Sequence, residues 1–170
     1  MLSVGRVAAI YTGFVFLAIL QAAWYGPRLP ETVASHFGGS GLPDGWMARQ
    51  SYILADVAIS VGVALFMLVM YAVMALCPLE FMNMPKKAFW LAPERQETAR
   101  RMIVSFALRF GILLQMFVQA VSILAAQANL RREPRMSPAI WLCLAGFMGA
   151  TLFLAVAMIW RFARVPRETT

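Results

Sequence analysis

Charged side chains are scarce in this sequence of 170 residues. Asp, Glu, Lys and Arg make up 14% of the chain, and only 8 residues are acidic, whereas a soluble domain carries about 25% charged residues. Hydrophobic residues make up 61%, and the mean hydropathy is +0.70. This composition excludes an ordinary soluble domain and favours a single domain that lies within a membrane.

Residues that bind metals or form disulfides are also few. The chain has one histidine, His36, and two cysteines, Cys77 and Cys143. No cluster has the spacing of metal ligands, so we expect neither a metal nor another cofactor. The two cysteines are expected near opposite membrane faces, too far apart for a disulfide, and we predict two free thiols. No nucleophile–base set and no phosphate-binding glycine loop is present, so we do not expect an enzyme.

Four apolar runs are long enough to cross a bilayer, whose hydrocarbon core of about 30 Å requires about 20 helical residues. The runs are residues 7–24, 52–77, 102–126 and 139–160. We therefore predict an all-α integral membrane protein in which residues 1–170 form one transmembrane domain, a four-transmembrane-helix bundle. The first run is longer than the usual apolar core of a signal peptide, and we expect it to be a retained helix.

The basic residues indicate an orientation. The net charge is +7 and the sequence pI is about 10.3, which in a soluble protein would suggest nucleic acid. Here the basic residues lie mainly at the ends of the runs, so we expect lipid headgroups as partners and no nucleic acid. The side that holds both termini has nine Lys and Arg residues, against five on the other side. The sequence therefore predicts a bacterial cytoplasmic (inner) membrane protein with cytosolic termini, a cytosolic loop at 78–101 and an extracytosolic loop at 26–50.

The loop at 26–50 has signals of an ordered structure. Residues 29–31, Leu-Pro-Glu, are typical of the start of a short helix, which the glycines of residues 38–41 would end. Residues 43–45, Pro-Asp-Gly, predict a turn, because proline presets φ and glycine accepts a positive φ. Spacing on one helical face, together with a returning tryptophan, predicts an apolar underside made of Leu29, Val33, Phe37 and Trp46.

His36 is open to two interpretations. In the first, its ring anchors the loop by bonding the backbone or Asp44. In the second, it contacts a ligand or acts as a pH-sensitive latch, because histidine is the side chain that ordinarily changes charge near neutral pH. Both interpretations place His36 beside the predicted turn. The candidate binding residues of this loop are His36, Phe37, Gly41, Pro43, Asp44, Gly45 and Trp46.

Two motifs resemble a known family. The first is Leu-Pro at 29–30, His-Phe at 36–37, and Gly-x-Pro-Asp-Gly-Trp at 41–46 followed by Arg49; the second lies within residues 85–98. In this order around an apolar run, they are similar to a bacterial membrane family catalogued as domain of unknown function 1648. Its members include the immunity protein against the sporulation-delay toxin, a longer protein with additional spans. The resemblance implies a multi-pass membrane fold and a role in immunity or signalling.

Several polar residues interrupt the spans, where polar groups are costly and are candidates for function. Helical spacing and predicted depth bring together a candidate intramembrane polar pocket of Gln21, Asp56, Ser60, Gln119 and Ser122. They are either interhelical hydrogen-bonding groups or an outward-opening pocket beneath the loop. Arg109 lies about two turns from the cytosolic end of its span; it either reaches the headgroups or has a function. In the fourth span, small residues such as Gly146 and Gly149 predict close helix packing.

The expected function is that of a membrane binding or regulatory protein. Its loop and polar pocket would engage a membrane lipid, a peptide toxin or another membrane protein. One alternative is an accessory structural subunit of a larger membrane complex. Another is a small transporter subunit, although no span has the interior proline that is typical of broken helices.

We predict that Cys77 and Cys143 are labelled from opposite sides of the membrane. In intact cells, a membrane-impermeant maleimide should leave Cys77 unmodified until the membrane is permeabilised, because Cys77 is predicted to face the cytosol. The single variants Cys77→Ser and Cys143→Ser assign each signal. Labelling of Cys77 in intact cells would contradict the predicted orientation.

Overall fold

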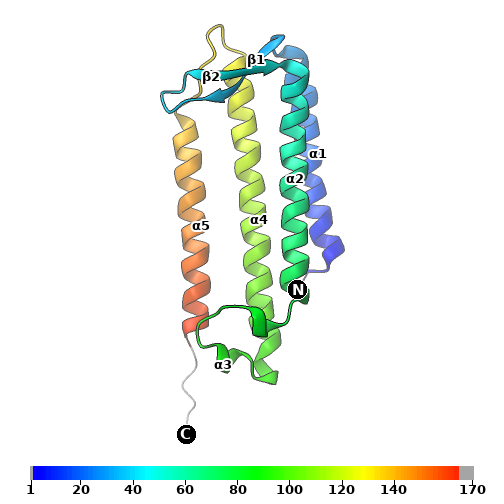
Figure 1. The fold of residues 1–170 in the computed structure, drawn as a ribbon, viewed down its shortest axis with the longest axis vertical. Helices are drawn as coiled ribbons and strands as arrows, with labels where there is room; N and C mark the ends of the chain where they lie inside the picture. Colours follow the sequence, from blue (N-terminus) through cyan, green and yellow to red (C-terminus); the bar gives the residue numbers. More distant parts are fainter. Residues whose placement is uncertain (1, 165–170) are drawn as a thin grey trace.

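The computed structural model describes residues 2–164, which form a mostly helical protein with a β-hairpin at one end (Figure 1). The four long helices are α1 (Val4–Tyr25), α2 (Arg49–Leu76), α4 (Pro93–Asn129) and α5 (Ala139–Ala163). The hairpin pairs β1 (Thr32–Phe37) with β2 (Pro43–Ala48). Shorter elements are η1 (Gly26–Arg28), η2 (Leu79–Phe81) and α3 (Lys87–Trp90).

The prediction of four long apolar helices is confirmed, because all four are long and apolar enough to cross a membrane. Such helices fit a multi-pass membrane protein. α4 is much longer than its predicted span. Its 37 residues correspond to about 55 Å at 1.5 Å per residue. Its first turns therefore extend beyond a hydrocarbon core of about 30 Å, and they contain charged residues such as Glu97 and Arg101.

Three of the four helices form the core. α1, α2 and α4 pack against one another, and their buried side chains form a cluster of Val7, Tyr11, Ala64, Met67, Tyr71 and Val104. Gly111 of α4 is required for this packing, because a Cβ atom there would lie 2.0 Å from the Tyr11 hydroxyl oxygen. The absence of a side chain at Gly111 therefore lets α1 and α4 approach closely.

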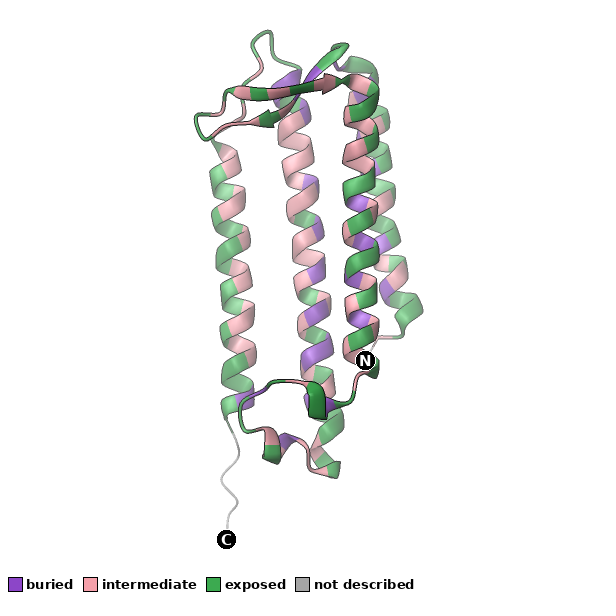
Figure 2. Cartoon of the chain, viewed as in Figure 1, coloured by how far each residue is buried: buried purple, intermediate pink, exposed green. Residues whose placement is uncertain are grey.

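The fourth helix, α5, packs mainly along α4, on the side away from α1 (Figure 1). Most of its residues are exposed or only half-buried (Figure 2), and the described exception is Phe162. This arrangement is more open than a four-helix bundle in which every helix contacts two neighbours. The predicted close packing at the small residues of α5 is wrong within the chain, since nothing lies within 4 Å of a Cβ atom built at Gly146 or Gly149.

A second apolar cluster closes the end of the molecule that holds α3. Trp90 donates a hydrogen bond from Nε1 to the carbonyl oxygen of Phe162 at 2.9 Å, and the two rings pack edge to face with their centroids 5.4 Å apart.

Arg100 caps the end of α2. It donates from Nη1 to the carbonyl oxygens of Ala75 (2.7 Å) and Cys77 (2.9 Å). This cation satisfies carbonyls at the end of α2, where the helix dipole also favours positive charge.

The loop at 26–50 is ordered, but its predicted helix is wrong. Residues from Thr32 onward form an antiparallel hairpin in which Thr32 pairs with Ala48 and Val33 with Met47. The spacing of Leu29, Val33 and Phe37 fits a helical face, but Thr and Val also favour strands. Leu29 and Val33 are buried as expected, whereas Trp46 is 52% exposed and so does not belong to the apolar underside.

The turn of the hairpin also differs from the prediction. Residues 43–45 begin β2, and the chain reverses at 38–41, where the amide of Gly38 donates to the carbonyl oxygen of Leu42 at 2.8 Å. Gly41 has a φ of +79°, in the left-handed region that glycine adopts without strain. Its carbonyl oxygen accepts a hydrogen bond from the Met136 amide at 2.9 Å, which joins the turn to the α4–α5 loop.

Asn129, the last residue of α4, attaches the hairpin to the helices. Its Oδ1 accepts from the Ala34 amide at 2.7 Å, and its Nδ2 donates at 3.0 Å to the carbonyl oxygens of Ala34 and Ala125. The side chain is 2% exposed. Asn129 therefore satisfies both backbone groups of Ala34, as a neighbouring strand would do. At the base of the hairpin, the amide of Arg49 donates to the carbonyl oxygen of Glu31 at 2.9 Å.

We predict that Asn129→Ala releases the hairpin from α4. The substitution leaves the amide and the carbonyl of Ala34 without partners, at a cost of about 1–3 kcal/mol for each buried group. Hydrogen exchange of the hairpin amides should accelerate, while exchange within α1 and α2 should change little. Gln127→Ala is the matched control, because Gln127 is exposed. Unchanged exchange at Ala34 in the Asn129 variant would contradict this role.

Candidate functional site

The hairpin holds His36 and Asp44 side by side. His36 pairs with Gly45 across the strands, and its Nδ1 contacts Oδ1 of Asp44. Gly45 permits this approach, because a Cβ atom there would lie 3.2 Å from the Cβ of His36. The predicted contact with Asp44 is thus present and agrees with the anchoring interpretation. Both side chains are largely exposed, so the pair lies on the surface.

Deeper in the bundle, glutamines of α4 bond to α2. Gln119 donates from Nε2 to the Ser60 hydroxyl at 3.0 Å and to the carbonyl oxygen of Phe14 in α1 at 3.2 Å. Gln115 donates from Nε2 to the carbonyl oxygen of Ser60 at 3.0 Å. All three polar side chains are buried. These bonds join α1, α2 and α4, as interhelical hydrogen bonds do in membrane proteins.

Asp56 and Ser122 meet one to two turns nearer the hairpin. The Ser122 hydroxyl donates to Oδ2 of Asp56 at 2.8 Å, as their positions along α2 and α4 predicted. Both residues are half-buried. No hydrogen bond or ion pair between Asp56 and Arg109 is found among residues 2–164, and the separation of about 20 Å expected along the helix axes explains why.

Gln21 is buried beside this pair, but neither of its side-chain polar atoms has a hydrogen-bond partner. The cavity next to Gln21, Asp56 and Ser122 has a volume of about 10 Å³, which is about the size of one water molecule. The five predicted residues therefore lie close together, but this space admits no larger ligand. Most of these residues form interhelical contacts, and only Asp56 and Ser122 border a larger cavity.

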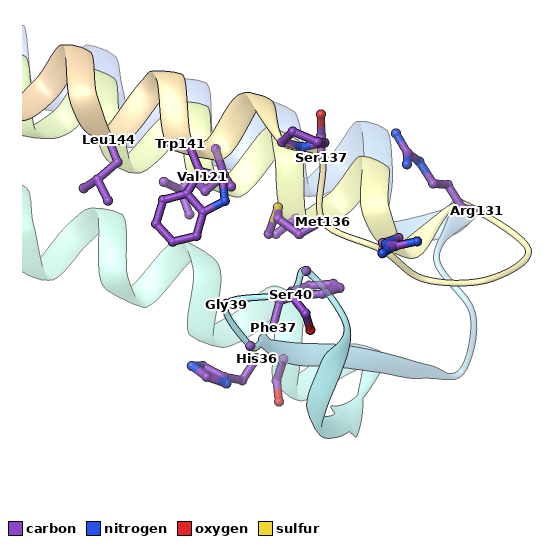
Figure 3. A pocket seen from close by; sticks show the side chains of 17 residues that line it. His36, Phe37, Gly39, Ser40, Val121, Arg131, Met136, Ser137, Trp141 and Leu144 are labelled. Carbon is purple, nitrogen blue, oxygen red and sulfur yellow. The ribbon is translucent and has the colours of Figure 1, made fainter.

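A cavity of about 820 Å³ lies between the hairpin turn, α4 and α5 (Figure 3). Val121 of α4 and Trp141 of α5 extend toward the space next to the hairpin (Figure 3). The apolar wall is completed by Ala125, Ile140 and Leu144. Around it lie Phe37, the glycine-rich turn and the basic residues Arg131 and Arg135. Three residues predicted to bind, His36, Phe37 and Gly41, thus border this cavity.

A second cavity of about 310 Å³ lies between α2 and α4 under the hairpin. It shares Ser35, Val121 and Ala125 with the larger cavity, and it is bordered by Asp56 and Ser122. We call the two cavities together the outer groove. Its floor is α4, and the hairpin covers its end. The Asp56–Ser122 pair is therefore the part of the predicted polar set that faces a ligand-sized space.

Sequence reasoning missed residues that the fold brings to the groove. Asn129 was not identified, although a buried asparagine at the end of an apolar helix is a signal of a specific polar contact. Arg131, Arg135 and Trp141 also line the groove, but their proximity to residues 38–41 depends on the fold and not on local sequence pattern. Four residues of the loop that were predicted to bind do not line either cavity: Pro43, Asp44, Gly45 and Trp46. No group of three or more His, Cys, Asp or Glu side chains within residues 2–164 is arranged to hold a metal ion.

The comparison with known protein families concerns the hairpin and the parts of α1 and α2 next to it. Residues 13–59 match the family model described as a domain of unknown function, DUF1648. The DUF1648 segment contains most of α1, the whole hairpin and the first turns of α2, and therefore also His36 and Asp56. It does not include α4 or α5, which form the floor and one wall of the outer groove. No curated protein and no solved structure matches the chain.

We predict energetic coupling between Asp56 and Ser122. In a double-mutant cycle of Asp56→Ala and Ser122→Ala, the coupling energy for unfolding in detergent should exceed about 0.5 kcal/mol, because the residues share one hydrogen bond. A control cycle of Asp56→Ala with Ser105→Ala uses an exposed serine at the other end of α4 and should be additive. Additivity in both cycles would mean that the hydrogen bond has no energetic role.

Proposed function

We propose that this chain is a multi-pass membrane binding protein whose outer groove holds an apolar segment of a peptide or of another membrane protein. The observation that supports the proposal is the cavity of about 820 Å³ beneath the hairpin turn. Its volume is within the range of about 300–1,000 Å³ that is typical of ligand pockets. It accommodates several side chains of a partner rather than a whole protein surface.

The chemistry of the groove indicates the kind of segment. Trp141, Leu144 and Val121 offer an apolar surface, while Arg131 and Arg135 lie beyond the outer end of α4. Of the acidic residues that the structure describes, Asp56 alone borders the groove. An apolar segment with a carboxylate near its outer end would match this arrangement, because arginine pairs well with carboxylates.

The open packing of α5 provides an entry path. Because α5 packs mainly on α4, the groove is bordered by α2 on one side and by α5 on the other, without a closed ring of helices (Figure 1). A segment that is already in the bilayer would reach the groove sideways. A hydrophobic peptide toxin is a member of this class of partner, and its capture would agree with the resemblance to the immunity protein.

In this proposal the hairpin is the cap of the binding site, on the extracytosolic side of a bacterial cytoplasmic membrane. The His36–Asp44 contact and the Asn129–Ala34 bonds hold the cap in place. The role is binding or regulation rather than catalysis. The alternative roles are those of an accessory subunit, in which the groove is filled permanently by a larger complex, and of a small transporter subunit.

Site-specific photo-crosslinking tests the proposal. We expect a photoreactive residue at position 144 to give a discrete peptide or protein adduct in native membranes. Position 142 is the matched control, because Leu142 lies on the same helix but is 77% exposed and should contact lipid. Charge reversal at Arg131 and Arg135 should lower the adduct yield at position 144 severalfold, since it removes the proposed partners of a carboxylate.

The possible outcomes separate the alternatives. Equal adducts at positions 142 and 144, or adducts with lipid alone, would contradict a partner-binding groove. A single stoichiometric protein adduct that copurifies without crosslinking would favour the accessory-subunit alternative. Mass spectrometry of the adduct identifies its class.

A further inference from the structure

A basic cavity lies at the opposite end of the helices from the outer groove. It has a volume of about 140 Å³ between α4 and α5, and it is lined by Arg109 and Arg161 together with Ser105. The other described residues that line it are apolar, and none of them is acidic. No hydrogen bond or ion pair joins either guanidinium to another residue within the described range 2–164. Among residues 2–164, two cations therefore share one cavity without a protein anion.

The two arginines lie at a similar depth. Arg109 is 20 residues before the end of α4 and Arg161 is 22 residues after the start of α5, so both are about 30–33 Å from the hairpin ends of their helices. A hydrocarbon core is about 30 Å thick, which puts the pair close to the headgroups on the α3 side. Trp160, next to Arg161, agrees with this depth, because tryptophans concentrate at membrane interfaces.

We propose that this cavity binds the phosphate of an anionic phospholipid. Guanidinium groups form paired, charge-assisted hydrogen bonds with phosphate oxygens, and basic pockets between transmembrane helices are suited to anionic headgroups. The Ser105 hydroxyl adds a neutral hydrogen-bond donor. The phosphate supplies the negative charge that the described protein residues do not provide.

The cavity's size and surroundings favour a lipid over a free phosphate ion. A volume of about 140 Å³ is below the range of about 300–1,000 Å³ typical of pockets for whole ligands, so only a headgroup-sized part fits. The apolar lining residues of α5, such as Leu154 and Ala157, lie between Arg161 and the membrane centre, and Phe153 is 71% exposed. Acyl chains would cover these residues, whereas a free ion would leave them without a partner.

The position of the cavity suggests what the lipid does for the fold. α5 packs mainly on α4, and at this end it is also tied to Trp90 through Phe162. A phosphate between Arg109 and Arg161 would add a link between α4 and α5 and would remove the repulsion between their two cations. This inference is independent of the proposed function, because it concerns other residues at the other end of the helices.

Native mass spectrometry of the purified full chain, after exchange into phosphatidylcholine nanodiscs with or without phosphatidylglycerol, tests the proposal. We expect the wild-type protein to retain phosphatidylglycerol in preference to phosphatidylcholine. Arg109→Gln/Arg161→Gln should lower that retention about tenfold. Arg164→Gln is the matched control, because Arg164 has the same charge and lies near the same helix end, but its guanidinium stacks on Trp160 outside the cavity.

Two further measurements distinguish the outcomes. Arg161→Gln alone, at the end of α5, keeps the interior of α4 intact and should still weaken retention, which covers the case in which the double variant fails to fold. An excess of inorganic phosphate should not displace the lipid. Equal retention by wild type and Arg161→Gln, an equal loss in Arg164→Gln, or full displacement by inorganic phosphate would each overturn the proposed lipid site.

Discussion

The paired hydrogen bonds between Asn129 and Ala34 are the interaction on which the arrangement of the site depends. A two-stranded hairpin has few contacts of its own and is marginally stable in isolation. Here one buried side chain at the end of α4 satisfies both backbone groups of Ala34. These bonds attach the hairpin to the end of α4. The Met136–Gly41 bond then holds the turn beside the start of α5, so that the cavity near the hairpin has a defined shape.

The helices divide into a packed part and an open part. α1, α2 and α4 share a buried core that is joined by Gln115, Gln119 and Ser60. α5 lies outside this core and packs mainly on α4. The cavities of about 820 Å³ and about 140 Å³ both lie between α4 and α5. The cavity at the hairpin end combines Arg131 and Arg135 with a long apolar wall, whereas the cavity at the α3 end is smaller and holds Arg109 and Arg161. We relate the first to a partner segment and the second to a lipid phosphate.

The sequence pattern correctly predicted the part of the site that depends on helix geometry alone. Positions along two antiparallel helices fix depth, so the Asp56–Ser122 contact could be expected from the sequence. The His36–Asp44 contact was predicted from a turn at residues 43–45 beside His36, whereas the chain reverses at residues 38–41. Spacing of Leu29, Val33 and Phe37 was ambiguous between helix and strand, and strand pairing decided it. The burial of Leu29 and Val33 was correct in either case, whereas the position of Trp46 depended on which structure formed.

The sequence by itself determined that four apolar helices form, because the hydrocarbon core sets the length and composition of any helix that crosses it. It also determined that an ordered loop at 26–50, with strong turn residues, joins the first two. The tertiary structure decided how this loop is used. The contact of Asn129 with Ala34 spans 95 residues, and Arg109 and Arg161 share a cavity although 52 positions separate them along the chain. Such contacts depend on which helix faces pack together, and local periodicity does not specify that choice.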